Sequence, residues 1–113
     1  MQITERSIQG GTVLMLSGEF NFTGRRTFND AVKKAWAVNC PHLLVNLEGI
    51  AFLDSAALGL LAIANQACQE KHCRMSLLKP QPYVAEVLKL ANIQKMIPIH
   101  ANEEEALKMV VRA

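Results

Sequence analysis

The sequence predicts a single α/β domain, with a mixed, mostly parallel sheet of about five strands and helices mainly on one face. The chain has 113 residues, and half of them are apolar. This length and composition predict one domain over residues 1–113, with enough apolar residues for a two-layer core. Apolar β-type runs alternate along the chain with segments of helical spacing. Because strand–helix–strand units place their strands in parallel, this alternation implies a parallel sheet packed against helices.

The chain begins with a predicted pair of strands. Residues 3–8 alternate loosely in polarity, and residues 12–17 form a stronger strand candidate after the turn residues Gly10-Gly11. Residues 21–24 then read as a loop, in which Thr23 is a candidate N-cap for the next helix.

The helix predicted after this loop has apolar residues at helical spacing, namely Phe28, Val32, Ala35 and Trp36. It ends at Asn39-Cys40-Pro41. Residues 43–47 are short and apolar, which predicts a central strand covered on both faces. A turn at Glu48-Gly49 and a second apolar step lead to the polar pair Asp54-Ser55.

The second half of the chain continues the alternation. We expect a helix over residues 56–68 that continues to about Lys71, a strand over 75–78, a helix over 83–90 and a strand over 97–99. Pro98 places the last strand at an edge of the sheet, since proline cannot donate to the strand ladder. A final helix follows the N-cap Asn102, with acids in its first turn and an apolar side made of Leu107, Val110 and Val111.

Composition and charge exclude several classes of function. The net charge of +2 lacks the basic footprint of a nucleic-acid binder. The apolar runs are too short to insert in a membrane, and the start of the chain does not resemble a secretion signal. Three cysteines give no disulfide framework, so we expect a cytoplasmic protein. No G-x-x-x-x-G-K-[ST] loop is present, and we expect no bound cofactor.

Ser55, at the predicted start of a helix, has three possible roles. As a helix cap, Asp54 or Ser55 would contribute about 1 kcal/mol. As a nucleophile, Ser55 would need a base and an oxyanion hole. The G-x-S-x-G elbow is missing, and nothing in the sequence places His42, His72 or His100 beside it. An enzyme is therefore the least favoured class, and we predict no catalytic residue.

The third role for Ser55 is that of a phosphate acceptor. A phosphate there would sit at a helix N-terminus, where free N–H groups and the helix dipole favour negative charge. It would place roughly −1.5 to −2 charges beside Asp54. If this surface binds a partner, phosphorylation would switch binding without a change of fold.

The helix after Ser55 has no polar residue between Ala56 and Ala64. A helix that is apolar all round is normally buried on every side. In a two-layer domain, either part of this helix is exposed as an interaction surface or a neighbouring helix covers it. The sequence leaves both options open.

The cysteines suggest a metal site only weakly. Cys68 and Cys73 flank His72, and only Cys40 and His42 remain to complete a set of four ligands. Buried thiols are the favoured interpretation, and we predict no metal site.

The segments LVNLEGIAFLDSAALGLL and NIQKMIPIHANEEEAL resemble the STAS domain family, as in stand-alone bacterial anti-sigma factor antagonists. Asp54-Ser55 and Leu58-Gly59 match the most specific family pattern, while Ala56 and Ala57 replace its usual small hydroxyl residue and glycine. Gly18-Glu19-Phe20-Asn21 resembles the family's Gly-Glu-Leu-Asp loop, with asparagine in place of aspartate. These departures leave open a different partner or a site that is no longer phosphorylated.

The resemblance implies a regulator that is not an enzyme. Ser55 would be phosphorylated by an anti-sigma factor that is a serine kinase, and a serine phosphatase would reverse the modification. The unphosphorylated domain would bind the kinase and free the sigma factor. The implied partner-binding residues around Ser55 are Asn21, Phe22, Asp54, Ala57 and Leu58. The alternative is a STAS subunit of a cytoplasmic lipid-transport ABC assembly, in which the same helix docks an ATPase and no phosphate is needed.

Overall fold

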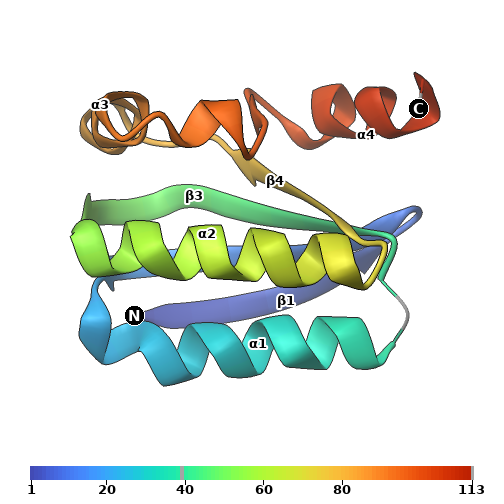
Figure 1. Cartoon of the computed structure of the whole chain (residues 1–113), viewed down its shortest axis with the longest axis horizontal. Helices are drawn as coiled ribbons and strands as arrows, with labels where there is room; N and C mark the ends of the chain where they lie inside the picture. The colour runs from blue at the N-terminus through green and yellow to red at the C-terminus, as the bar shows by residue number, and fades with distance from the viewer. Residues whose placement is uncertain (39, 113) are drawn as a thin grey trace.

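A five-stranded sheet in the order β1-β2-β3-β4-β5 forms the centre of the described structure. The computed structural model describes the backbone of residues 1–38 and 40–112, and the side chains of residues 1–38 and 40–107. β1 is antiparallel to β2, and β2, β3, β4 and β5 are parallel to one another (Figure 1). These observations confirm the predicted fold class.

The described residues form the following elements in chain order: β1 (Gln2–Ile8), β2 (Gly11–Phe20), the 3₁₀ helix η1 (Phe22–Gly24), α1 (Arg25–Ala37), β3 (His42–Leu53), α2 (Ser55–Glu70), β4 (Arg74–Leu78), α3 (Pro82–Leu90), the 3₁₀ helix η2 (Ile93–Lys95), β5 (Ile99–His100) and α4 (Glu103–Arg112).

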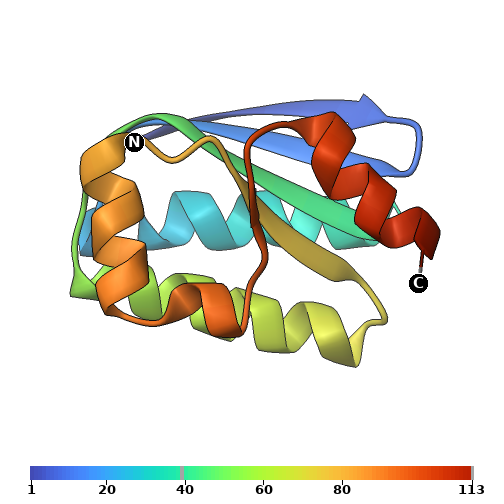
Figure 2. The same ribbon diagram turned by 90° about the horizontal axis from the view of Figure 1, so that it is seen from above.

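Three of the four described α-helices pack on one face of the sheet. Side chains of α1, α2 and α3 join the inward residues of β2, β3 and β4 in the larger apolar core. α4 covers the other face, where Ala106 packs with Val13, Leu44 and Leu78. Figure 2 shows α2 and α4 separated by β3 and β4. Burial of this apolar surface is the main stabilising contribution, at about 25 cal/mol per Å² removed from water.

β3 is longer than the sequence predicted, because the predicted turn at Glu48-Gly49 is wrong. Both residues lie inside β3, at a point where the pairing between β2 and β3 shifts register. A Cβ added to Gly49 would lie 2.7 Å from the carbonyl oxygen of Leu16. Only glycine allows β2 to approach this closely, so Gly49 keeps the two strands paired as far as their ends.

Three smaller predictions are settled by hydrogen bonds and pairing. Thr23 is not the cap of α1, since the Asn21 side chain accepts a hydrogen bond from the Thr23 N–H at 3.1 Å and begins η1 instead. The final strand is Ile99–His100, and its position at the edge of the sheet is confirmed. The Asn102 cap of α4 is confirmed by a 2.8 Å bond from the Glu105 N–H.

Two predictions concern residues whose positions are not described. The expected helix end included Asn39, and the expected apolar side of α4 included Val110 and Val111. Asn39 and these two side chains lie outside the described residues.

A buried histidine lies where β3 begins. His42 is 1% exposed, and its Nε2 lies 2.8 Å from the Ser76 hydroxyl oxygen on β4. Burial lowers the pKa of His42 to about 4, and the charges of Arg74 and His100 act in the same direction. His42 is therefore neutral in the folded protein near pH 7.

Candidate partner-binding site at the start of helix α2

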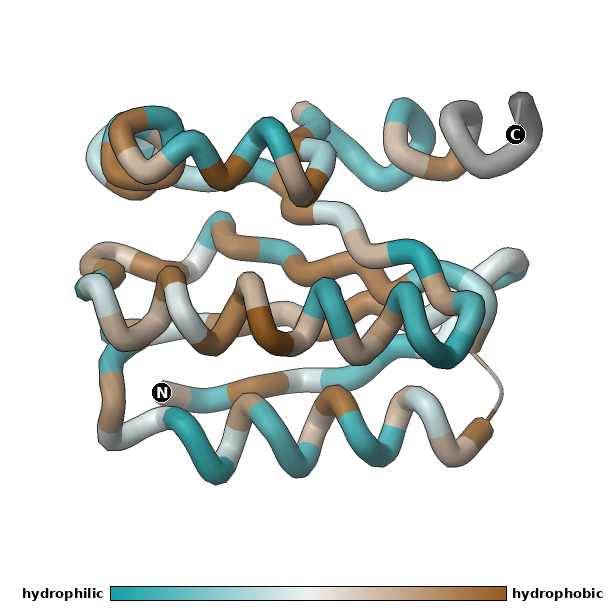
Figure 3. Tube along the Cα trace, viewed as in Figure 1, coloured by the Kyte–Doolittle hydropathy of each residue, from teal (hydrophilic) through white to brown (hydrophobic). Residues whose placement is uncertain are grey.

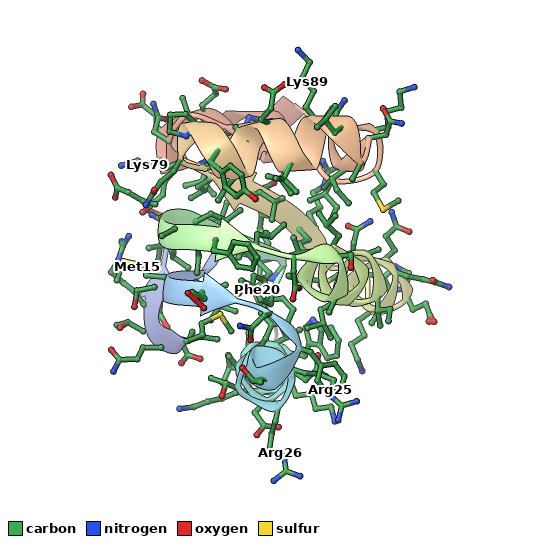
Figure 4. The ribbon with its side chains drawn as sticks, turned by 90° about the vertical axis from the view of Figure 1, so that its left-hand side faces the viewer. Met15, Phe20, Arg25, Arg26, Lys79 and Lys89 are labelled. Carbon is green, nitrogen blue, oxygen red and sulfur yellow. The ribbon has the colours of Figure 1, made fainter. Side chains whose placement is uncertain are left out.

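The ends of two parallel strands bring the loop after β2 beside the start of α2. Phe20 pairs in register with Leu53, and the Asp54 N–H donates to the Phe20 carbonyl oxygen at 3.3 Å. Asn21 and Asp54 therefore each follow one of two paired strand ends. Figure 4 looks onto this end of the molecule, with Phe20 near its centre and α2 seen end-on.

Asp54 is the residue that caps α2. Its backbone is extended, and its carboxylate accepts a hydrogen bond from the Ala57 N–H at 3.0 Å. Ser55 is then the first helical residue, and it is exposed. Capping therefore explains the aspartate and does not explain the serine. An exposed hydroxyl at the positive end of a helix is accessible to another protein.

We expect Asp54→Ala to lower the free energy of unfolding by about 1 kcal/mol, because the Ala57 N–H loses its acceptor. Urea unfolding followed by circular dichroism measures this change. Asp54→Asn is the matched control, since an asparagine side chain can accept the same bond. Equal stability of the alanine variant and the natural protein would contradict the capping role.

One side of α2 is exposed along its first half. Ala57, Leu60, Leu61 and Ala64 are buried in the core, whereas Ser55, Gly59 and Ile63 lie four residues apart on the exposed side. Ile63 is 67% exposed. Figure 3 shows this first half as neutral or hydrophobic, with the hydrophilic residues in the second half. Of the two options that the sequence left open, the structure therefore shows a partly exposed outer side of the helix.

Gly59 lies on this exposed side, one turn after Ser55. A Cβ added to Gly59 would meet nothing within 4 Å. Glycine inside a helix lowers stability by about 1 kcal/mol relative to alanine. None of the described contacts within this chain requires a glycine at position 59.

Exposed aromatic side chains lie at the same end of the sheet. Phe22 is exposed, with the Arg25 guanidinium 4.7 Å from its ring centroid. Phe52, two residues before Asp54, stacks on Tyr83 of α3 with ring centroids 6.4 Å apart, and both are exposed. Aromatic residues and arginine are enriched at protein–protein interfaces.

The predicted partner-binding residues take different positions. Phe22 is exposed, and Asp54 and Leu58 are half-buried, Leu58 also packing against the core. Asn21 is half-buried and its side-chain oxygen is occupied by Thr23. Ala57 is 0% exposed, so its side chain cannot contact a partner, and it is removed from the predicted surface.

Sequence reasoning missed Phe52 and Tyr83. Phe52 lies within an apolar run of the sequence, which gives no sign that it is exposed. Its exposure depends on how the side chains of β3 divide between the two faces of the sheet. Tyr83 follows the proline that begins α3, and only the packing of α3 brings it to β3.

The histidines lie away from Ser55. His42 begins β3, whereas Ser55 follows its end, and His72 follows the far end of α2. His100 lies opposite Leu78, which is in register with Asn46, well before the end of β3. Among the described residues no group of three or more His, Cys, Asp or Glu side chains is arranged to hold a metal ion. No helix within the described part of the chain is long and apolar enough to span a membrane.

The fold and the exposed start of α2 define a small α/β domain with a surface suited to binding another protein. The family model of the STAS domain matches residues 2–106, and the chain belongs to this family. The match confirms the resemblance seen in the sequence.

Relatives and solved structures agree with this assignment. The chain is 26% identical over 111 residues to an anti-sigma F factor antagonist of Paenibacillus polymyxa, covering 95% of this chain and 92% of the relative. It matches the structure of the anti-sigma factor antagonist SpoIIAA in its unphosphorylated form, with a TM-score of 0.80 at 22% identity over 99% of this chain and 98% of that one. The phosphorylated form of SpoIIAA, a Bacillus cell fate determinant, matches with a TM-score of 0.71 at 22% identity, over 96% and 99% of the two chains. These structural similarities show the common fold.

Proposed function

We propose that this protein is an anti-sigma factor antagonist that acts by partner switching. It binds an anti-sigma factor with serine kinase activity while Ser55 is unphosphorylated, and it releases this partner when Ser55 carries a phosphate. The observation that carries the proposal is the exposed hydroxyl of Ser55 at the start of α2, directly after its capping aspartate. The relative named anti-sigma F factor antagonist supports the same function.

A phosphate on Ser55 would act through charge and leave the fold unchanged. The first turn of a helix carries N–H groups without intrahelical partners, and these favour an anion. The phosphate would add roughly −1.5 to −2 charges next to the Asp54 carboxylate. A partner covering this surface would have to desolvate that charge, which weakens binding.

The proposed docking surface consists of the exposed side of α2 and the neighbouring loop. It is made of Asn21, Phe22, Asp54, Ser55, Leu58, Gly59 and Ile63. Its centre is apolar and contains small residues, so a partner can approach the helix backbone closely.

The antagonist acts by binding alone, and a serine phosphatase restores the unphosphorylated form. The alternative is a subunit of a lipid-transport ABC assembly, which would use the same side of α2 and need no phosphate. The two candidate functions can be distinguished by one property. Only the antagonist has a partner whose binding depends on the charge at residue 55.

Affinity capture tests the proposal and separates it from the alternative. Columns carrying Ser55→Ala and Ser55→Asp are loaded with extract of the source cells, and the bound proteins are identified by mass spectrometry. We expect a protein kinase on the first column that is absent from the second. With ATP, that kinase should add one phosphate to Ser55 of the natural protein. Recovery of an ABC-transporter ATPase on both columns would favour the alternative.

Gly59→Ala should change stability and binding in opposite directions. The helix propensity of alanine should raise the free energy of unfolding by about 0.5–1 kcal/mol, since the added methyl group meets nothing in this chain. The same methyl group should weaken binding of the captured kinase if the partner lies against α2. Urea unfolding and calorimetric titration measure the two effects.

Gln69→Ala, on an exposed site at the far end of α2, is the matched control and should leave binding unchanged. Unaltered affinity of Gly59→Ala would remove Gly59 from the docking surface.

A further inference from the structure

The outer edge of β4 is only partly paired. β4 has five residues and β5 has two, so among the described residues only Leu77 and Leu78 of β4 pair with β5. Figure 2 shows the chain between η2 and α4 passing the end of β4, away from its start. A pocket of about 190 Å³ lies beside the first half of β4. Its lining comes from the start of β3, the second half of α2, β4 and the segment around β5.

Two histidines line this pocket, and each has a buried ring nitrogen without a hydrogen-bond partner among the described residues. One is Nδ1 of His42, a residue that is 1% exposed. The other is Nε2 of His100. Buried polar atoms in folded proteins nearly always have a partner. The two nitrogens therefore mark a place where a group from outside the chain can bind.

The opposite nitrogen of each ring decides what the unpartnered one offers. Nδ1 of His100 lies 3.2 Å from the Glu105 carboxylate, and an ionised carboxylate only accepts, so this Nδ1 carries a proton. Nε2 of His100 then donates when the ring is an imidazolium. Nε2 of His42 lies 2.8 Å from the Ser76 hydroxyl, which can donate to it. The neutral His42 ring then carries its proton on Nδ1 and can donate it to a ligand.

Arg74 supplies a positive charge at the same pocket. It begins β4, in register with His42, and it is exposed. Neither of the two ion pairs among the described side chains involves Arg74. None of the described lining residues is an acid, and the Glu105 carboxylate bonds to His100 without lining the pocket. The pocket therefore favours an anion, and the planar guanidinium of arginine matches the geometry of a carboxylate.

The rest of the lining limits the size and kind of ligand. Its described residues are Asn65, Gln69, Cys73, Met75, Met96 and Pro98. Four of these six are apolar or weakly polar, and methionine adapts to the shape of what it contacts. A cavity of about 150 Å³ in another protein holds one benzene ring. A pocket of about 190 Å³ therefore has room for one ring with a small charged group. A bare phosphate would leave the apolar side chains without a partner, and a long acyl chain would not fit.

We propose that this pocket binds a compact monocarboxylate with an aromatic or branched aliphatic body, for which benzoate is the model ligand. The Arg74 guanidinium binds the carboxylate, and the unpartnered ring nitrogens of His42 and His100 donate further hydrogen bonds to it. The apolar body packs against the methionines and the proline of the lining. Binding is noncovalent and does not depend on Ser55 or on the kinase.

Titration of the natural protein with benzoate, followed by NMR of the histidine rings, tests this site. The chain has three histidines, and His72, which is exposed and does not line the pocket, is the internal control. We expect saturable shifts of the His42 and His100 ring signals and an unchanged His72 signal. Benzamide, which has the same shape without the charge, should bind at least about tenfold more weakly.

Arg74→Gln should weaken benzoate binding at least about tenfold, because the carboxylate loses its charged partner. Arg74 is exposed, so the variant should keep its fold, which circular dichroism checks. Arg26→Gln, at an exposed arginine of α1, is the matched control and should bind benzoate as the natural protein does. Four results would each overturn the proposal: no saturable binding, equal shifts of all three histidines, equal affinity of Arg74→Gln, or displacement of benzoate by an equal concentration of inorganic phosphate.

Discussion

Ser55→Asp should weaken binding of the anti-sigma kinase at least about tenfold, which corresponds to about 1.4 kcal/mol of binding free energy. The new carboxylate stands on the exposed first residue of α2, next to the Asp54 carboxylate. A partner that covers this surface must desolvate two negative charges in place of one. Calorimetric titration of the captured kinase measures the loss.

The stability of the same variant separates a binding effect from a folding effect. An acid in the first turn of a helix interacts favourably with the dipole, so Ser55→Asp should keep its free energy of unfolding within about 0.5 kcal/mol of the natural protein. Ser55→Ala is the control, and it should retain both stability and binding. Loss of binding in Ser55→Ala would show that the hydroxyl itself contacts the partner. A large loss of stability in Ser55→Asp would show that Ser55 has a structural role.

Acid should destabilise the protein through His42, by up to about 3 kcal/mol between pH 6.5 and pH 4. The pKa of His42 is lowered from 6.5 to about 4 in the folded state, chiefly by burial. Between these values the unfolded chain binds the proton more readily than the folded one. The free energy of unfolding therefore rises with pH across this window. The penalty is absent above pH 6.5 and grows as the pH falls toward 4.

His42→Gln isolates this effect, since glutamine does not titrate and its amide can bond the Ser76 hydroxyl. Urea unfolding at several pH values measures the slope for both proteins. Carboxylates contribute to the slope of each, so the difference between the two slopes reports His42. Equal slopes would contradict the assignment of a buried, neutral histidine.

The sequence was sufficient for the order of the elements, because each strand and helix carries its own periodicity. It was insufficient where a distant group decides the local structure. Glu48-Gly49 reads as a turn, yet both residues lie in β3, where the glycine leaves room for the Leu16 carbonyl. Thr23 is a good cap by residue type, but its hydroxyl donates to the Asn21 side chain, and Thr23 lies inside η1.

The same distinction applies to the site. Asp54 and Ser55 could be recognised because they interrupt two apolar runs, and the structure adds which of them is the cap. Ala57 could not be placed, since burial on α2 depends on which side of the helix meets the sheet. The stacked pair of Phe52 and Tyr83 could not be found either, because it exists only once α3 packs against β3.

In the proposed partner switch, a phosphate on Ser55 controls binding of the anti-sigma kinase. The most direct measurement compares the affinity of that kinase for the natural protein before and after Ser55 is phosphorylated, with circular dichroism showing the same fold in both forms. We predict that the phosphorylated form binds at least about tenfold more weakly. Equal affinity of the two forms, or a phosphate that the kinase places on another residue, would contradict this account.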